Sequence, residues 1–350
     1  MKKIFSDKGI ALLMVLWVLM LLTVIVGEFC FAMKTRVNIT RNFKESTEAY
    51  YIAVAGLNKA IEQTLLQQMT PRKAVSGGEN DDEAADAEEA AVAWRINTDM
   101  PPGAFGSGEY EIRIENESGK INLNLADRDL LKVMLAGFDI DDEQKDVIAD
   151  SILDWRDSDR NHLINGAEDD YYQSLPEPYE CKDGDFDAKE ELLRVRGVTP
   201  EIYEGLAAVV TVFPKSDDRK QKQRAGKKGF DYNRLNINSI PLALWANFPG
   251  MTDALAADIA AYRAEKDFES LRELVDIVGP EVYRGMAKYL TTQTSPYFII
   301  QSTGKIPGSR IAEGLTAVVL FDVRAEKKYQ VIQWTDDIDR HQPGGRPQGP

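Results

Sequence analysis

An unbroken apolar run lies almost at the start of the chain and constrains its fold more than any other feature. Residues 10–32 read IALLMVLWVLMLLTVIVGEFCFA, in which Glu28 is the only charged residue. A helix rises about 1.5 Å per residue, so about 20 apolar residues cross the hydrocarbon core of a bilayer. The run is therefore long enough to form a transmembrane helix that anchors the rest of the chain.

A short basic leader, MKKIFSDKG, precedes this run and ends at Gly9. A secretory signal peptide usually has a shorter apolar stretch, followed by a small-residue cleavage site. The sequence around Gly27 and Glu28 is a poor site of that kind. One interpretation is an uncleaved signal anchor whose leader lysines stay in the cytoplasm. The other is a helix that is retained after its leader is removed.

The charge of the chain restricts its partners. Its 350 residues are 43% hydrophobic, which is enough for a sizeable core, and its formal net charge is −15. A surface this acidic repels the phosphates of nucleic acids, so we expect no nucleic-acid partner. Cys30 lies within the apolar run and Cys181 lies far along the chain, so we expect no disulfide bond between them.

After the apolar run the pattern becomes amphipathic up to about residue 69. Apolar residues recur every three or four positions, at Tyr50, Val54, Leu57, Ile61 and Leu65. This spacing predicts a helix with one buried face, and Pro71 ends it. We expect one long rod that continues the transmembrane helix; two helices with a hinge near Gly27 are the alternative. The acidic residues 77–93 are expected to form a loop.

Strand patterns lie near both ends of the remaining chain. Residues 110–115 alternate in hydrophobicity, and residues 297–300, 315–323 and 329–334 also read as strands. The cost of closing a loop rises slowly with its length, so strands on either side of a long insertion can pair. The expected fold class is α+β. A long N-terminal helix, transmembrane and then amphipathic, packs on an antiparallel sheet, and a large all-α insertion interrupts the sheet.

These patterns divide the chain into segments. We predict a leader at 1–9, a transmembrane helix at 10–32, an α+β core at 33–120 and 291–336, a helical insertion at 121–290 and a disordered tail at 337–350. Within the insertion, KINLNLA at 120–126 aligns with RLNINSI at 234–240. We therefore expect two similar modules, 121–213 and 230–290. Chance similarity of two Asn-capped helices is the alternative.

An acidic loop lies within the first module. Counted from Asp157, oxygen-bearing side chains fall at positions 1, 3, 5 and 12, namely Asp157, Asp159, Asn161 and Glu168. This spacing is typical of a loop that wraps a calcium ion, which prefers six to eight oxygen ligands. Position 6 is His162 where such loops have Gly, so this is not a regular EF-hand, and a solvated loop is the alternative. A later acidic cluster either adds ligands or is solvated: Glu180, Asp183, Asp185 and Asp187.

Two segments resemble helix-hairpin-helix motifs, one around Gly197 and one around Gly250. DNA-binding motifs of this kind carry basic residues beside the turn. Here Glu201 and Glu204 follow the first turn and Asp253 follows the second. We therefore interpret both segments as packing motifs of a helical domain rather than as DNA-binding sites.

The sequence contains no recognisable catalytic set. Its two histidines are His162, in the acidic loop, and His341, near the end of the chain. There is no Gly-rich phosphate loop of the Walker type and no Cys pair with metal-ligand spacing. We therefore do not expect an enzyme.

The Lys8-Gly9 pair directly before an apolar helix resembles the leader of type IV prepilins. This resemblance implies that prepilin peptidase cuts between Gly9 and Ile10 and that the new N-terminus is methylated. Most pilins and pseudopilins have Glu at the fifth mature position, where it pairs with the N-terminal amine of a neighbouring subunit. Here that position is Met14, which suits a subunit with no neighbour ahead of it, because an unpaired buried charge is costly.

Minor pseudopilins of the K type in type II secretion share this feature, and the chain resembles them over nearly its whole mature length. Their calcium-binding stretch is matched here by Asp154, Trp155, Asp157, Asp159, Gly166, Ala167, Glu168, Asp169 and Tyr172. The resemblance implies a structural calcium ion. We expect Asp157, Asp159 and Glu168 to be its first ligands, followed by Asp169 and Asp170.

The resemblance also implies a location and a set of partners. The chain would cross the bacterial inner membrane once, with most of its residues in the periplasm, and would initiate or cap the pseudopilus at its tip. The implied partners are the I-type and J-type minor pseudopilins, the major pseudopilin, prepilin peptidase, the inner-membrane secretion platform and inner-membrane lipid. The alternatives are a membrane-anchored DNA-uptake receptor and a minor type IV pilus subunit.

Overall fold

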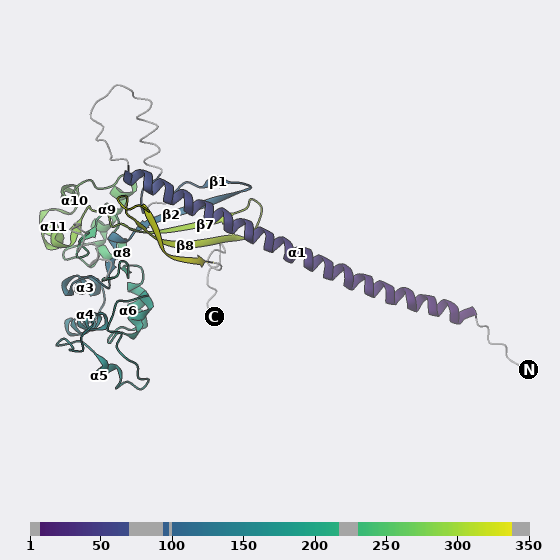
Figure 1. The fold of residues 1–350 in the computed structure, drawn as a ribbon, viewed down its shortest axis with the longest axis horizontal. Helices are drawn as coiled ribbons and strands as arrows, with labels where there is room; N and C mark the ends of the chain where they lie inside the picture. The colour runs from purple at the N-terminus through teal and green to yellow at the C-terminus, as the bar shows by residue number, and fades with distance from the viewer. Residues whose placement is uncertain (1–7, 70–93, 98–99, 217–229, 338–350) are drawn as a thin grey trace, which may run out of the picture.

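A computed structural model describes residues 8–69, 94–97, 100–216 and 230–337. It contains one very long helix, a sheet packed on the end of that helix, and a mostly helical insertion beside the sheet (Figure 1). The α-helices are α1 (Lys8–Met69), α3 (Arg128–Leu135), α4 (Asp142–Arg156), α5 (Asp169–Tyr172), α6 (Pro200–Leu206), α8 (Leu242–Trp245), α9 (Asp253–Glu265), α10 (Leu271–Val278) and α11 (Pro280–Met286). The strands are β1 (Gly103–Phe105), β2 (Gly108–Asn116), β3 (Ile121–Asn122), β4 (Val210–Thr211), β5 (Leu235–Asn236), β6 (Leu290–Thr291), β7 (Tyr297–Lys305), β8 (Ala312–Phe321) and β9 (Tyr329–Asp337).

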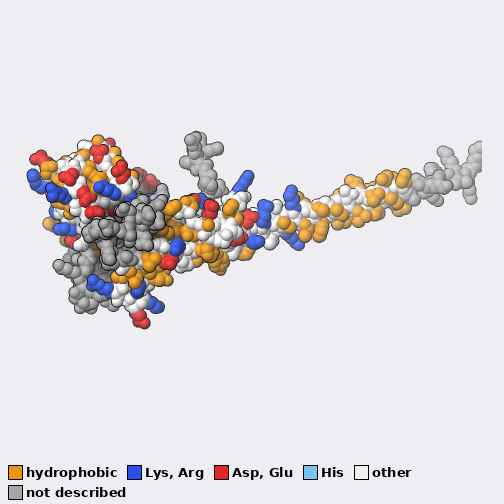
Figure 2. Space-filling model, turned by 90° about the horizontal axis from the view of Figure 1, so that it is seen from above, with side chains coloured by type: hydrophobic (Ala, Val, Ile, Leu, Met, Phe, Trp, Pro, Cys, Tyr) orange, Lys and Arg blue, Asp and Glu red, His pale blue; other side chains and the backbone are white. Residues whose placement is uncertain are grey.

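Helix α1 continues without interruption past Gly27, so the alternative of two helices with a hinge is wrong. Its 62 residues span about 90 Å at 1.5 Å per residue. The part from Leu12 to Phe43 projects from the rest of the protein with exposed side chains, and by length and composition it can cross a membrane. Figure 2 shows hydrophobic side chains along this part, with Lys and Arg nearer the globular end.

The other end of α1 packs on the sheet through small residues. Ala49, Ala53 and Ala60 are fully buried on this face of the helix. Opposite them lies Gly304 of β7, where a Cβ atom would collide with the Ala49 carbonyl group. The small side chains on both surfaces therefore allow the helix and the sheet to approach closely.

The main sheet is antiparallel, with the strand order β1-β2-β7-β8-β9. Strands β2 and β7 are central neighbours although the whole insertion separates them in sequence, with Glu109 opposite Lys305 and Asn116 opposite Phe298. The predicted α+β fold is confirmed. The predicted segments 110–115, 297–300 and 329–334 lie in strands, and the segment 315–323 lies in β8 up to Phe321, where that strand ends. Strand β9 includes Asp337, so the tail predicted at 337–350 begins inside a strand; its other residues lie outside the described part of the chain.

The sequence pattern predicted a purely helical insertion, but the insertion also contains strands. Each module also contains a short parallel strand pair that joins its first and last segments. Ile121 pairs with Val210 in the first module, and Leu235 pairs with Leu290 in the second. Two-residue strands have no recognisable hydrophobic period. They form because the entering and leaving segments lie side by side in the core and their buried backbone groups must pair.

Equivalent side chains make the same contacts in the two modules. Asn124 Oδ1 accepts the Phe186 N–H at 2.7 Å and its Nδ2 donates to the Phe186 carbonyl at 3.1 Å. Asn238 makes the same pair of bonds to Phe268, at 2.8 and 2.9 Å. These asparagines occupy matching places in the aligned KINLNLA and RLNINSI segments. The two modules share one hydrophobic core, which is separate from the core between α1 and the sheet.

The two modules differ in the segment that precedes the bonded phenylalanine, which is Phe186 in the first module and Phe268 in the second. Arg156 and Arg263 stand at equivalent places near the ends of α4 and α9, and both donate to carbonyl groups of the aligned Asn-containing segments. Residues 157–185 follow in the first module, whereas only residues 264–267 follow in the second. The acidic loop is therefore an addition to a repeated framework, and it carries the candidate site.

Candidate metal centre

Asp154, near the end of α4, lies against Gly166 of the acidic loop. Asp154 is fully buried, and its two carboxylate oxygens lie 3.2 and 3.1 Å from the Leu163 N–H that donates to them. A Cβ atom at Gly166 would collide with Asp154 Oδ2. Only glycine leaves room for the carboxylate at this point. Asp154 therefore shapes the loop from within.

An aromatic cluster of Trp155, Tyr172 and Tyr179 packs within the acidic loop. Trp155 meets Tyr172 edge to face with ring centroids 5.3 Å apart, and Tyr172 stacks on Tyr179 at 5.3 Å. Arg196 reaches across from the start of the following hairpin. Its Nη1 donates to the Gly166 carbonyl at 3.0 Å, and its guanidinium lies 4.7 Å from the centre of the Tyr171 ring. These contacts fix the loop backbone on the first module.

The structure brings the three first-choice ligands together. A carboxylate oxygen from each of Asp157, Asp159 and Glu168 lies within 4.8 Å of the other two. Asp157 directly follows the last residue of α4, and its Oδ1 accepts the Asp159 N–H at 3.2 Å. This turn places both aspartates on the side of the loop that faces Glu168.

Glu168 is the most unusual residue of the group. Its side chain is 2% exposed, and neither carboxylate oxygen has a hydrogen-bond partner among the described residues. The pKa of Glu168 is raised to about 7, mainly by burial and also by the negative charges of Asp183, Asp154 and Asp157. A buried carboxylate without a partner is costly. A bound cation would supply the missing partner, so these oxygen donors fit a divalent cation such as calcium.

The remaining predicted ligands lie elsewhere. Asp169 Oδ1 accepts the Cys181 N–H at 2.8 Å, and Asp170 is exposed to solvent. Both belong to the short helix α5, and neither is among the converging ligand atoms of the described residues. Asn161 Nδ2 donates to Asp159 Oδ1 at 2.9 Å, so its amide acts as a support for that carboxylate. His162 is exposed, and its Nδ1 lies 3.0 Å from the Leu163 carbonyl oxygen.

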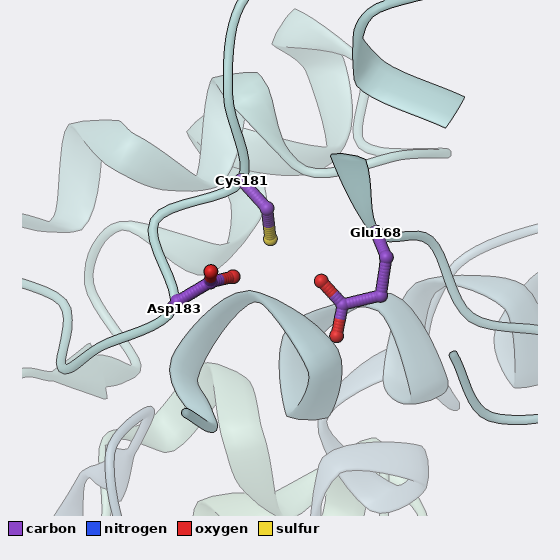
Figure 3. Close-up of side chains that lie close together, drawn as sticks. All are labelled: Glu168, Cys181 and Asp183. Carbon is purple, nitrogen blue, oxygen red and sulfur yellow. The ribbon is translucent and has the colours of Figure 1, made fainter. Parts of the chain in front are cut away.

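A second group of possible ligands shares Glu168 with the first. One ligand atom each from Glu168, Cys181 and Asp183 lies within 4.8 Å of the others (Figure 3). Asp183 was expected within an acidic cluster, whereas Cys181 was not expected at a site. The signal available was a cysteine two residues before an aspartate in that cluster. Burial raises the pKa of the Cys181 thiol to about 12, so it is protonated when no cation is present.

The other acids of that cluster have different partners. Asp185 Oδ2 accepts the Ser216 N–H at 2.7 Å. Asp187 forms ion pairs with Lys182, at 2.6 Å, and with Lys215. These ammonium groups hold the pKa of Asp187 down at about 2. Glu180 is exposed. Of the four acids, Asp183 alone joins the group around Glu168.

The basic residues of the first hairpin are engaged with this loop. Arg194 lies over the Tyr179 ring, and Arg196 holds Gly166 and Tyr171. Both arginines thus face the protein beside the Gly197 turn, where a DNA-binding hairpin would direct its cations to a phosphate. The basic segment at 217–229 lies outside the described residues.

Comparisons with known proteins agree with this architecture. The family model described as type II secretion system (T2SS), protein K, matches residues 114–215, which include the whole acidic loop. Over these residues the chain resembles type II secretion system protein K. The sequence-based assignment to the K type of minor pseudopilin is thereby confirmed, and so is its role in type II secretion.

Members of the protein K family from two species resemble the chain over most of its length. It is 25% identical to type II secretion system protein K of Pseudomonas aeruginosa, over 76% of this chain and 75% of that protein. It is 23% identical to type II secretion system protein K of Aeromonas hydrophila, over 72% of this chain and 81% of that protein. A solved structure, the GspK–GspI–GspJ complex from enterotoxigenic Escherichia coli, contains a similar fold with a TM-score of 0.56. The sequence identity is 16%, and the match covers 85% of this chain and 98% of that one.

Proposed function

We propose that this protein is the tip subunit of the type II secretion pseudopilus, where it initiates or caps assembly. It is anchored in the bacterial inner membrane by α1, and its globular part lies in the periplasm. The supporting observation is the shape of the molecule. An exposed apolar helix runs from one end, and the bulky insertion lies at the other end, beside the sheet (Figure 1).

The position of the insertion favours a terminal place in the filament. Pseudopilus subunits pack through their N-terminal helices, so each globular part lies next to those of its neighbours. Here the helical modules extend beyond the end of α1 that carries the sheet. They would block a further subunit on that side. Met14 stands where most pseudopilins have Glu, and it lies on the exposed apolar part of α1. An apolar residue at this position agrees with a subunit that has no neighbouring subunit ahead of it in the filament.

We propose I-type and J-type minor pseudopilins as the direct partners. A chain of similar fold has been solved in a GspK–GspI–GspJ complex, and the match covers nearly all of that chain. The major pseudopilin, prepilin peptidase, the inner-membrane secretion platform and membrane lipid complete the proposed set. Gly9 and Ile10, the predicted processing residues, lie in the first turn of α1, whereas leader residues 1–7 lie outside the described part. We propose a structural role without catalysis.

We further propose that Asp157, Asp159 and Glu168 hold a structural calcium ion. The carboxylate oxygens of these residues converge, and Glu168 lacks another partner among the described residues. The ion would neutralise the buried Glu168 carboxylate together with the more exposed Asp157 and Asp159, and it would link the loop to the end of α4. It would stabilise the folded state by binding to it alone.

Co-purification tests the proposed place in the assembly. The full chain, extracted from membranes in detergent, is mixed with the I-type and J-type pseudopilins of the same organism. We expect a stable three-component complex. Minor type IV pilins from the same organism and a labelled DNA duplex at moderate salt serve as competing partners. A complex with those pilins or with DNA, and none with the I-type and J-type subunits, would overturn the proposal.

A further inference from the structure

We propose that the cleft between the open face of the sheet and the helical insertion binds an extended, acidic segment of a partner polypeptide. The cleft has a volume of about 790 Å³ and lies where the α+β core meets both modules. None of its described lining residues belongs to the acidic loop that carries the candidate metal centre. It is therefore a separate site, and its chemistry does not depend on the place of the protein in a filament.

The floor of the cleft is the face of the sheet that α1 leaves uncovered. Side chains along a strand point alternately to the two faces, and Ile300 of β7 is buried on the face that packs on α1. The opposite face carries a polar row that lines the cleft and crosses four neighbouring strands in register: Arg113, Gln301, Thr316 and Thr335. Gln and Thr side chains both donate and accept hydrogen bonds. They can therefore bond the N–H and C=O groups of an extended peptide.

Small side chains of both modules form much of the wall. Ala207 and Ala208 follow α6 in the first module, and Ala260 and Ala264 belong to α9 in the second. None of the described residues that line the cleft is aromatic. Single-stranded nucleic acids bind largely by stacking their bases on aromatic side chains, and this lining offers bases no such surface. The lining therefore favours a polypeptide over a nucleic acid.

The charge of the cleft is opposite to that of the whole chain. Its lining includes five cationic side chains and two acidic ones, whereas the formal net charge of the chain is −15. The cations are Arg95, Arg113, Lys120, Lys189 and Arg263, and the acids are Glu115 and Asp267. Exposed charges are screened over about 8 Å at physiological ionic strength, so the nearest charges decide what enters the cleft. Carboxylates are therefore attracted here although the protein as a whole is acidic.

Two of these cations lack a carboxylate partner among the described residues. Lys189 Nζ donates to the Ala207 carbonyl at 2.7 Å, and Arg263 Nη1 donates to the Ile240 carbonyl at 2.6 Å. The pKa of each is lowered, mainly by burial. A half-buried charge without a counter-ion is unfavourable. One acidic segment lying along the cleft can neutralise both, because Lys189 comes from the first module and Arg263 from the second.

The remaining cations already have carboxylate partners. Arg95 pairs with Asp267 at 2.9 Å, and Lys120 pairs with Glu115 at 3.0 Å. Arg263 also differs from Arg156, its equivalent in the first module. Arg156 uses both terminal nitrogens on backbone carbonyl groups, whereas Arg263 uses one. The second terminal nitrogen of Arg263 is thus available to a ligand.

The size of the cleft decides between a peptide segment and a small anion. Ligand pockets in proteins hold about 300–1,000 Å³, and this cleft lies within that range. A water molecule takes about 30 Å³ of the liquid, so one inorganic anion would fill only a small part of the space. An extended segment fills more of it and also reaches the polar row. We therefore assign the cleft to a peptide with carboxylates on alternate residues, which places them on one side of the extended chain.

Fluorescence anisotropy with the full chain in a non-ionic detergent tests this proposal. The probe is a labelled peptide of alternating Glu and Thr, and the matched peptide has Gln in place of Glu. Inorganic phosphate and an oligothymidylate serve as competitors. The test variants are Lys189→Gln and Arg113→Gln. The matched control is Lys327→Gln, which removes the same charge from an exposed position between β8 and β9, outside the cleft.

We expect the wild type and Lys327→Gln to bind the Glu peptide equally and the Gln peptide at least about tenfold more weakly. Lys189→Gln should weaken binding about tenfold, and Arg113→Gln about threefold because Arg113 is more exposed. Circular dichroism spectra that match the wild type show that the variants are folded. An absence of binding by the wild type, or equal affinities for the wild type and both test variants, would overturn the proposal. Equal weakening by Lys327→Gln would also overturn it, since the attraction would then be unspecific.

Two further outcomes identify a different occupant and also refute the proposal. The first is displacement of the peptide by phosphate or oligothymidylate at lower concentrations than by unlabelled peptide, which assigns the cleft to a phosphate ligand. The second concerns residues 79–89 of this chain, which are themselves acidic and lie outside the described part. Their carboxylates are replaced with amides in one variant. Peptide binding to that variant alone would show that the chain's own segment, and not a partner, is the occupant.

Discussion

The side chain of Asn116 is bonded to both backbone groups of Ser295, donating to its carbonyl at 2.8 Å and accepting from its N–H at 3.2 Å. Asn116 is the last residue of β2, where the chain leaves the sheet, and Ser295 lies where the chain returns to it. The same amide also donates to the Tyr297 carbonyl at 3.1 Å. The buried Asn116 side chain therefore holds together the two segments through which the chain leaves the α+β core for the insertion and returns from it.

We predict that Asn116→Ala lowers the stability of the protein by about 2–4 kcal/mol. The substitution leaves the buried backbone groups of Ser295 without partners, and each such group costs about 1–3 kcal/mol. The measurement is thermal unfolding of the full chain in detergent, followed by circular dichroism. Asn58→Ala is the matched control, because Asn58 is exposed on α1 and its change should stay within about 0.5 kcal/mol. Equal melting temperatures for the two variants would contradict the prediction.

The equivalent asparagines of the two modules give a second prediction. Asn124→Ala and Asn238→Ala should each lower stability by about 2–4 kcal/mol, because each leaves both backbone groups of one phenylalanine unpaired. Asn124 also donates to the Val212 carbonyl at 2.9 Å, so its loss should be the larger of the two. Urea unfolding of both variants checks this order. A neutral effect at either position would show that the modules are not held in the same way.

The fold could be predicted largely because its main signals are long and periodic. The apolar run, the helix face from Tyr50 to Leu65 and the alternating strands each repeat a pattern over many residues. The strand pairs that close the modules could not be predicted in this way. Ile121 and Val210 meet because the module folds back on itself, and two residues are too few to show a period.

The candidate site was predictable only where its residues are close in sequence. Asp157, Asp159 and Glu168 belong to one loop, and their spacing is that of ligands around one ion. Asp169 was expected to follow Glu168 into the site, but α5 begins there and redirects the side chain to the Cys181 N–H. Cys181 lies beside the loop because Tyr179 stacks on Tyr172 and the Cys181 N–H donates to Asp169. No local pattern reports such a contact.

A third prediction concerns removal of calcium. A chelator should lower the melting temperature of the full chain, because an ion at a hundredfold excess over its Kd stabilises the folded state by about 2.7 kcal/mol. The double variant Asp159→Ala with Glu168→Ala should melt at the same temperature with and without calcium. Asp170→Ala is the matched control, since Asp170 is exposed and outside the group, and it should keep the full response. A melting temperature of the wild type that does not respond to the chelator would discard the calcium proposal.

A fourth prediction follows from the raised pKa of Glu168. In the protein without cations, burial raises this pKa from its ordinary value of 4.5 to about 7, so the folded state binds the proton more tightly than the unfolded state. Stability should therefore fall as the pH rises from about 4.5 to 7, because the unfolded chain ionises first. Calcium should reverse this trend, since it binds the ionised carboxylate. Melting temperatures measured across this range with chelator should decline in the wild type and stay flatter in Glu168→Gln.

The last prediction concerns the start of the mature chain. We expect mass spectrometry of the membrane-extracted protein to find Ile10, methylated, as the first residue. An uncut leader would leave Lys2, Lys3 and Lys8 attached to the apolar end of α1, where charges are costly within a bundle of membrane helices. Replacing Gly9 with a bulky residue, as in Gly9→Leu, should block the cut and prevent co-purification with the I-type and J-type subunits. Gly27→Leu is the matched control within the same helix, because a Cβ atom at Gly27 meets no neighbouring atom, and it should be processed normally. A wild-type chain that still begins at Met1, or that begins beyond Ala32, contradicts the proposed retention of α1 as an anchor and packing helix.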